Sequence, residues 1–225
     1  MITDRPDKLY TTVVCTRSGE ALGLVYSSKE SICASLECGR GVYFSRRRGL
    51  WRKGDTSGHY QTLHRLDVDC DGDALRFTVT QCGGDNDDND NKCVEHSTTG
   101  PCFCHLNRFT CWGPSNGIRQ LEFTMKDRLK NAPSGSYTKR LFDDSQLLQD
   151  KLVEEAQELA EATTKEEVAS ELADVLYFAM ARAVKAGVSI DDAISVLDAR
   201  TRKVTRRKGD SKVVRIEEGN QILSK

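Results

Sequence analysis

The second half of this 225-residue chain contains no cysteine, although the chain has nine, all between positions 15 and 111. The chain also lacks an apolar run long enough to span a membrane. Its first residues, MITDRPDKLY, lack the apolar core of a secretion signal. We therefore expect a cytoplasmic protein with no membrane partner. In a reducing compartment, clustered cysteines favour a metal site over disulfide bonds.

Neither sign of charge is in excess, because 33 basic residues face 34 acidic ones and leave a net charge of −1. Such a chain has no bulk attraction to nucleic acid or to an anionic membrane. It also lacks the C-x₂-C pairs that are typical of zinc-stabilised nucleic-acid-binding modules. A module of that kind on a helical dimerisation domain stays an alternative, supported by the basic run at 46–48 and by the Cys/His cluster. We expect no nucleic-acid partner.

The pattern of apolar residues changes near position 118. Before it, short β-branched segments alternate with turns and predict strands, with one short helix that ends at Gly39. After it, apolar residues recur with a helical period. The segments that we expect to be helical are 118–130, 144–162, 163–187 and 189–204. The fold class is therefore α+β, with a mainly β domain (1–113), an all-α domain (118–203), and a tail or linker (204–225) compatible with a connection to a further domain.

Three segments of the chain are predicted to be turns or loops. They are the charged segment 46–58, the polar segment 83–92 and the segment 132–138 between two expected helices. The helix 163–187 is expected to start with a capping box formed by Thr164 and Glu167. Along the helix 118–130, Ile118, Leu121, Met125 and Leu129 share one stripe, and along 144–162 Leu148, Leu152, Ala156 and Leu159 share another.

The segment DVDCDGD (67–73) carries four aspartates around one cysteine. In an extended segment, Asp69, Asp71 and Asp73 share one face and Cys70 points to the other. Carboxylates suit Mg²⁺, whereas a thiolate suits Zn²⁺. The segment therefore predicts ligands for two different metals.

One cysteine does not make a zinc site, and spacing alone does not select its partners. Three protein ligands with an open position are typical of catalytic zinc, and four ligands are typical of structural zinc. Some of the cysteines are alternatively small buried apolar residues. The candidate partners are Cys93, His96, Cys102, Cys104, His105 and Cys111.

Three motifs, FSRRRGLWRKGDTSG, DCDGD and CHLNRFTC, together resemble the phosphoribosyl-AMP cyclohydrolases of histidine biosynthesis. The resemblance implies zinc on Cys70, Cys104 and Cys111, and Mg²⁺ on Asp69, Asp71 and Asp73. It also implies a homodimer whose zinc draws ligands from both subunits. Zinc lowers the pKa of bound water to about 7, and His105 would shuttle the proton.

The same resemblance implies that the basic segment holds the phosphates of a nucleotide substrate and that Trp51 offers an apolar surface. The residues concerned are Arg46, Trp51, Lys53, Gly54, Asp55, Thr56 and Ser57. The chain departs from the family at three positions, where His59 replaces Asn, Asn107 replaces Gly and Trp112 replaces Phe. Segment 83–103 is also longer than in compact bacterial members.

Two acid pairs lie in the helical half. Glu155 and Glu158 are three residues apart, as are Glu171 and Asp174, so each pair shares a helix face. Two antiparallel helices would bring the four carboxylates together. The alternative is an ordinary solvated helix face.

This spacing resembles the MazG-like nucleotide pyrophosphohydrolases and, with SYTKRL and KLVEEAQE, most closely phosphoribosyl-ATP pyrophosphohydrolase. The resemblance implies Mg²⁺ on the four acids, while Phe178 stands where the family often has His. It places Ser136, Tyr137, Thr138, Lys151 and Arg200 at the substrate. Together the two resemblances imply a bifunctional hydrolase that releases pyrophosphate and then opens an adenine ring between N1 and C6, with Zn²⁺ and Mg²⁺ as cofactors.

Overall fold

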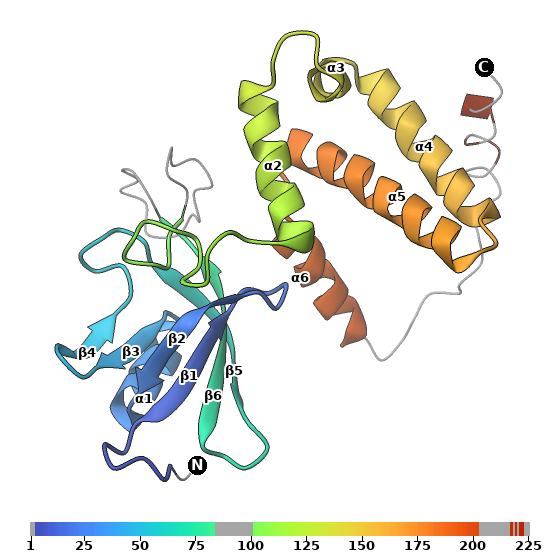
Figure 1. Cartoon of the computed structure of the whole chain (residues 1–225). Coiled ribbons are helices and arrows are strands. Elements are labelled where there is room, and N and C mark those ends of the chain that lie inside the picture. Colours follow the sequence, from blue (N-terminus) through green and yellow to red (C-terminus); the bar gives the residue numbers. More distant parts are fainter. Residues whose placement is uncertain (1–2, 84–100, 203–216, 218, 220, 223–225) are drawn as a thin grey trace. The chain divides into compact units, whose positions relative to one another are not determined.

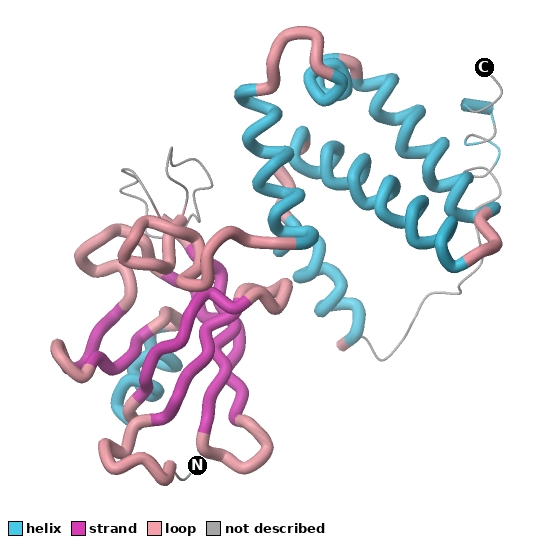
Figure 2. Tube along the Cα trace, in the orientation of Figure 1, coloured by secondary structure: helices cyan, strands magenta, loops and turns pink. Residues whose placement is uncertain are grey.

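The chain forms two compact units, Met1–Ser115 and Asn116–Lys225. The computed structural model describes residues 3–83, 101–202, 217, 219 and 221–222. The first unit is mainly β and the second is helical (Figure 1, Figure 2), which confirms the predicted α+β class. Most of the predicted polar loop 83–92 and of the tail 204–225 lies outside the described residues. Among the described helices, none is both long enough and apolar enough to cross a bilayer.

The first unit is built on one six-stranded sheet with the order β4-β3-β2-β1-β6-β5. Its elements are β1 (Tyr10–Cys15), β2 (Ala21–Ser27), α1 (Lys29–Cys38), β3 (Val42–Ser45), β4 (Gly49–Arg52), β5 (Gln61–Val68) and β6 (Ala74–Gln81). The segment before β3 bonds to the far edge strand β5, through Gly41 N–H to the Gln61 carbonyl (3.4 Å) and Leu63 N–H to the Gly39 carbonyl (2.8 Å). The sheet therefore curls into a half-barrel.

The half-barrel closes around side chains that alternate inward along its strands. The buried apolar core consists of Tyr10, Val14, Leu22, Tyr43, Leu75, Phe77, Val79 and Phe103. The predicted short helix is confirmed as α1, since Ser28 caps its first turn and Gly39, at φ 66°, ends it in the left-handed region.

The sequence predicted the charged segment 46–58 to be a turn, but the structure shows that it also contains a strand. It contains β4, which pairs with β3 through Phe44 opposite Leu50. Trp51 packs against Tyr43 of the core, with ring centroids 6.0 Å apart. Leu50 and Trp51, which lie between basic residues, therefore form part of a strand, because Trp51 packs against the core.

In the described part of the second unit, every regular element is a helix. Its helices are α2 (Gly117–Asn131), α3 (Tyr137–Asp143), α4 (Ser145–Glu161), α5 (Lys165–Lys185) and α6 (Ile190–Thr201). Figure 1 shows α4 and α5 lying side by side, and both contribute to the core. That core consists of Met125, Leu141, Phe142, Leu148, Phe178, Met180, Ala181 and Val184.

The capping box at the start of α5, between Thr164 and Glu167, is confirmed. One other expectation for this unit was wrong. The predicted loop 132–138 contains the start of α3, where the Ser136 side chain accepts a hydrogen bond from Lys139 N–H (3.2 Å). Each predicted apolar stripe has one exposed member, Leu129 in the first and Ala156 in the second, whereas Leu159 beyond Ala156 is half-buried. Helical periodicity places residues on one side of a helix, but only neighbouring elements decide how much of that side is covered.

Candidate active sites

The turn between β5 and β6 gathers Asp69, Asp71 and Asp73, whose carboxylates each offer an oxygen within 4.8 Å of the others. The segment is a turn rather than the extended strand that the sequence suggested. Asp69 shapes it, because its Oδ1 accepts the backbone N–H groups of Gly72 and Ala74, both at 3.0 Å. The three acids converge, although for a different reason from the predicted alternation of side chains.

The electrostatics of this acidic turn favour a cation. The hydrogen bond from Ala74 N–H lowers the pKa of Asp69 and keeps it charged. Repulsion from Asp71 raises the pKa of Asp73. Exposed carboxylates that repel one another at this range are a suitable oxygen ligand set for Mg²⁺.

Cys104 and Cys111 lie together in the segment that follows β6. Burial and the neighbouring Cys104 thiol raise the pKa of Cys111 to about 11. Cys111 N–H donates to the Leu22 carbonyl in β2 (2.7 Å), which holds the segment against the sheet. His105 is exposed beside Cys104. Two neighbouring thiols are a donor set that suits a soft metal ion such as Zn²⁺.

Cys70 does not join this pair within one chain. Cys70 precedes Ala74, the first residue of β6. Cys111 lies beside Leu22 of β2, which is level with Cys15 of β1. Cys15 pairs with Thr78, four residues further along β6 than Ala74. Four strand residues span about 13 Å, and two strand spacings add about 4.8 Å each. Sulfur ligands of one zinc lie only about 4 Å apart, because each is about 2.3 Å from the metal. Figure 1 likewise shows the β5–β6 turn and the segment after residue 101 at opposite ends of the sheet.

The structure places Lys53 inside the protein. Its ammonium group donates to the carbonyls of His59 (3.0 Å) and Cys102 (3.1 Å), and it lies 5.8 Å from the Phe103 ring centre. Burial lowers the pKa of Lys53. This lysine therefore ties the turn of Gly54, Asp55, Thr56 and Ser57 to the segment that carries Cys104.

The other basic-segment residues divide between the two ends of the sheet. Arg46 lies 4.9 Å from the centre of the Tyr26 ring, on the side of the acidic turn. Asp55 pairs with Arg52 at 2.7 Å, whereas Thr56 and Ser57 are exposed. The predicted phosphate-binding residues thus belong to two places within one chain.

In the helical unit, α4 and α5 bring Glu155, Glu158 and Glu171 together, again with one oxygen of each within 4.8 Å of the others. Asp174, one turn beyond Glu171, is outside this group and exposed. Glu155 is buried and forms an ion pair with Lys151, with 2.7 Å between the ammonium nitrogen and the carboxylate oxygen. Partial removal from water and the charges of Glu155, Glu171 and Glu154 raise the pKa of Glu158. A single lysine leaves this cluster with excess negative charge.

Two family models match the chain. The model described as phosphoribosyl-AMP cyclohydrolase matches residues 23–93, and the model described as phosphoribosyl-ATP pyrophosphohydrolase matches residues 118–201. Histidine biosynthesis bifunctional protein HisIE of Thermus thermophilus is 32% identical over 200 residues, which cover 83% of this chain and 85% of that protein. The chain belongs to the bifunctional histidine-biosynthesis proteins. Its first unit carries the cyclohydrolase domain and its second the pyrophosphohydrolase domain.

Fungal relatives of this bifunctional protein are longer than the chain. Histidine biosynthesis bifunctional protein his7 of Schizosaccharomyces pombe is 54% identical over 211 residues, which cover 94% of this chain and 46% of that protein. The histidine biosynthesis trifunctional protein of Saccharomyces cerevisiae is 48% identical over 212 residues, which cover 93% of this chain and 24% of that protein. The chain thus spans less than half the length of these two relatives.

The departures of the cyclohydrolase domain from its family have structural counterparts. Asn107 adopts a φ of 55° in the tight turn after Cys104, a left-handed conformation that glycine adopts without strain and that asparagine tolerates. His59 accepts a hydrogen bond from Cys102 N–H at its Nδ1 (3.3 Å). Trp112 is exposed beside Cys111.

In the pyrophosphohydrolase domain, the predicted substrate residues fall into three groups. Ser136 caps α3, and Thr138 is buried with its hydroxyl 3.3 Å from the Tyr177 hydroxyl. Tyr137 is exposed near the acidic cluster, and its pKa is raised by partial burial and further by the charge of Glu155. Arg200 is exposed in the last turn of α6.

Phe178 takes a structural place where the family often has histidine. It is buried in the helical core, and the Lys151 ammonium lies 5.5 Å from its ring centre. Burial lowers the pKa of Lys151, but its hydrogen bonds to Glu154 and Glu155 outweigh this effect. The pKa is therefore raised above that of an ordinary lysine. Phe178 therefore supports the lysine that holds the buried glutamate.

Sequence reasoning missed a buried hydrogen-bonded chain beneath the cysteine segment. The Tyr43 hydroxyl donates to Gln61 (2.6 Å), the Gln61 amide donates to Gln81 (2.9 Å), and the Gln81 amide donates to the Cys102 carbonyl (2.9 Å). The signal in the sequence was two glutamines at inward positions of strands β5 and β6. Buried amides need partners, so such positions predict a polar network.

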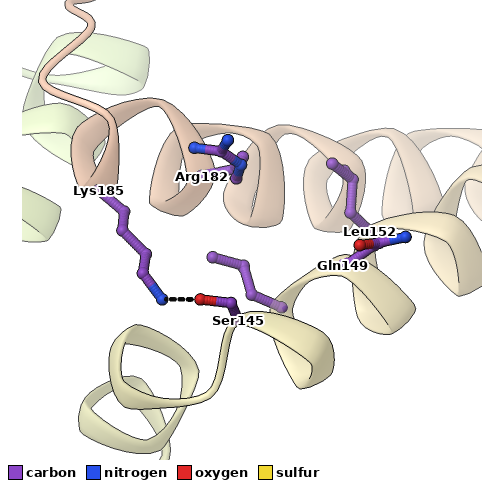
Figure 3. Close-up of a pocket in the computed structure, with 6 residues that line it drawn as sticks. Ser145, Gln149, Leu152, Arg182 and Lys185 are labelled. Carbon is purple, nitrogen blue, oxygen red and sulfur yellow. Dashed lines mark hydrogen bonds between the residues drawn. The ribbon is translucent and has the colours of Figure 1, made fainter.

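A pocket of about 350 Å³ lies between α4 and α5 but does not contain the acidic cluster. Figure 3 shows Lys185 reaching across its end to Ser145, where the ammonium donates to the hydroxyl at 2.8 Å. Leu148 and Leu152 form apolar parts of its lining. None of the predicted metal or substrate residues lines this pocket.

Proposed function

We propose that the chain catalyses two successive hydrolyses of histidine biosynthesis. The helical unit hydrolyses phosphoribosyl-ATP to phosphoribosyl-AMP and pyrophosphate, and the β unit opens the adenine ring of that product. The observation that carries the proposal is that each unit gathers its own carboxylate cluster, and each unit matches the family model for one of the two reactions.

In the helical unit, Glu155, Glu158 and Glu171 would hold Mg²⁺, and Asp174 would join them when the cation binds. The residues fit a cation because their charges repel one another and raise the pKa of Glu158. Bound Mg²⁺ supplies charge neutralisation on the polyphosphate. Lys151 fixes Glu155 through their 2.7 Å ion pair, and Tyr137, whose pKa responds to the charges of both residues, would contact the substrate. Water adds to a phosphorus atom of the triphosphate as the bond to pyrophosphate breaks.

In the β unit, Cys104 and Cys111 would hold zinc, and the acidic turn would hold Mg²⁺. Two adjacent thiols fit a soft metal. Bound zinc supplies Lewis acidity toward water. His105, exposed beside Cys104, takes the proton of the attacking water, whose oxygen bonds to C6. The N1–C6 bond breaks and N1 receives a proton.

We further propose a homodimer in which the third zinc ligand is Cys70 of a second copy. Cys70 is exposed on the acidic turn, far from the cysteine pair of its own chain. Two copies arranged so that opposite ends of their sheets meet would complete two equivalent sites. In the helical unit, a stripe on α5 also supports association, because Val168, Leu172 and Leu176 are 39%, 46% and 44% exposed. We place this dimer in the cytoplasm.

The test is an assay of the purified chain with phosphoribosyl-ATP, Mg²⁺ and Zn²⁺. Pyrophosphate release and the absorbance change of ring opening are followed separately. Glu171→Gln should lower pyrophosphate release by roughly 100-fold or more, and Cys104→Ala should do the same to ring opening. Ring opening by Glu171→Gln is measured with phosphoribosyl-AMP supplied directly.

Matched controls separate these effects from general damage. Glu166→Gln removes an exposed acid from the same helix, and Cys33→Ala removes an exposed thiol from α1. Both should leave both activities within twofold of the wild type. A wild-type chain that carries out neither reaction with both metals would overturn the proposal and favour a zinc-stabilised nucleic-acid-binding module instead.

A further inference from the structure

A second pocket, of about 770 Å³, lies in the β unit where the N-terminal segment passes the start of α1. Three cationic side chains line it, from three separate segments: Lys8, Lys29 and Arg46. We propose that this pocket binds a phosphate monoester of the nucleotide substrate. The inference rests on the proposed ring-opening function and adds Lys8 and Lys29 to its binding residues.

The position of the pocket relates it to the acidic turn. Tyr10 lines the pocket and starts β1, and the next residue, Thr11, pairs with Ala74 directly after Asp73. A ligand in the pocket would therefore lie at the same end of the sheet as Asp69, Asp71 and Asp73. A nucleotide can span both, since its phosphate and its ring are several ångströms apart.

The loop that presents Lys8 is held by its own hydrogen bonds. Lys8 N–H donates to the Arg5 carbonyl (3.0 Å), Leu9 N–H donates to Asp7 (3.2 Å), and the Thr3 hydroxyl donates to the Leu9 carbonyl (2.9 Å). Lys8 itself has a φ of 56°. A lysine is strained in this left-handed conformation, which a glycine adopts freely, and such strain is typical of functional positions.

The charges around the pocket leave room for an anion. Of the two acids in its lining, Asp7 is paired with Arg5 at 2.9 Å, and Glu30 lies in the first turn of α1. Arg46 lies over the Tyr26 ring, which positions its guanidinium, and its charge also acts on Asp7, which already has Arg5 as its ion-pair partner. Cations from three segments suit a phosphate, which accepts hydrogen bonds from several directions.

The test compares Lys8→Met and Lys29→Met with Arg47→Met in ring opening of phosphoribosyl-AMP. Arg47 is exposed beside Arg46 but does not line the pocket, so its variant removes the same charge from the same surface. Each lysine variant should raise KM about tenfold with kcat within twofold, as expected for loss of one charge-assisted phosphate contact. Lys8→Arg should restore KM. Pyrophosphate release should not change.

A binding arm separates this inference from the proposed activity. Adenosine 5′-monophosphate and adenosine are titrated into the wild type and both lysine variants by calorimetry. The monophosphate should bind the wild type about tenfold more tightly than it binds either variant, and adenosine should not distinguish them. Equal effects in Arg47→Met, or no effect in the lysine variants, would overturn the inference even if ring opening is intact. If ring opening is absent from the wild type, the titration still decides about the pocket.

Discussion

Cys70 and Cys104 belong to opposite ends of the same sheet, because Cys70 precedes β6 and Cys104 lies in the segment after it. The register between β1, β2 and β6 keeps them apart by more than about 13 Å. One metal ion cannot use both from the same chain. Any site that uses both must take them from two chains.

This arrangement predicts that two inactive variants restore each other's ring opening. Cys70→Ala and Cys104→Ala, each expected to be inactive alone, form mixed dimers after coexpression or joint refolding. Each mixed dimer has one site that carries both substitutions and one intact site. Random pairing makes half of the dimers mixed, so about a quarter of wild-type activity should return. Ring-opening rate against mixing ratio is the measurement.

The control is a mixture of Cys104→Ala with Cys111→Ala. In the proposed dimer, one chain supplies both of these residues to a given site. No mixed dimer in that pairing has an intact site, so activity should stay absent. Recovery in this control, or none in the first mixture, would contradict zinc ligands from two chains.

Gly23→Ala should damage the cysteine site specifically. A Cβ at position 23 would overlap the Phe103 ring and lie 3.1 Å from the Cys111 sulfur. Overpacking of this kind costs about 1–3 kcal/mol and shifts neighbouring side chains. We expect less zinc bound per chain and slower ring opening, with unchanged pyrophosphate release. Metal analysis of the purified variant measures the first effect.

The smaller side chain in the double variant Gly23→Ala with Phe103→Leu should relieve the overlap and restore part of the zinc content. Leu24→Ala, at the neighbouring exposed position in β2, is the matched control and should keep normal zinc content. If Gly23→Ala binds zinc normally, Gly23 does not shape this site.

Glu158→Gln should make the helical unit less dependent on Mg²⁺. Repulsion within the cluster contributes to the raised pKa of Glu158, so removing its charge should raise the melting temperature of the metal-free protein. The same change removes a proposed Mg²⁺ ligand, so Mg²⁺ should stabilise the variant less than the wild type. Glu166→Gln should keep the full Mg²⁺ effect. Thermal unfolding with and without Mg²⁺ measures both.

The metal-free wild type should also depend on pH in a defined direction. The folded chain binds the Glu158 proton more tightly than the unfolded chain, because the folded pKa lies above the ordinary 4.5. Acidification through the folded pKa toward 4.5 therefore favours folding through this group. The Glu158→Gln variant should lose that contribution. An equal pH dependence in wild type and variant would contradict this assignment.

Asn107 offers a prediction about backbone strain near Cys104, a proposed zinc ligand. Asn107→Gly should leave the β unit as stable as the wild type or slightly more so, because glycine adopts φ near 55° freely. Asn107→Ala should cost about 1 kcal/mol, because alanine lacks the tolerance of asparagine for this conformation. Urea unfolding of the two variants measures the difference. Equal stability would show that the turn relaxes to another conformation.

Spacing predicted much of both acidic clusters. Glu155 and Glu158 share a helix face because of the helical period, and this needed no knowledge of the fold. The turn of Asp69, Asp71 and Asp73 was also found, although alternation along a strand was the wrong reason. Side chains only two residues apart converge in several backbone conformations, so the conclusion survived.

Contacts between distant segments could not be predicted in the same way. Lys53 was predicted to hold a substrate phosphate from a basic run, and its burial against the carbonyls of His59 and Cys102 depends on segments far from it in the sequence. The distance between Cys70 and Cys104 depends on strand register, which no local pattern contains. The start of α3 was missed because Ser136 looked like part of a loop rather than a helix cap.

The chain from Tyr43 through Gln61 and Gln81 to the Cys102 carbonyl has a fixed direction. A backbone carbonyl only accepts hydrogen bonds, so Gln81 must turn its NH₂ group toward Cys102 and its oxygen toward Gln61. Gln61 must then donate to Gln81, and its own oxygen is left for the tyrosine hydroxyl. An isosteric Gln61→Glu change would set two acceptors face to face. A substitution that alters almost no volume would thus loosen the loop of Cys104, because it removes the donor that keeps the NH₂ group of Gln81 turned toward Cys102.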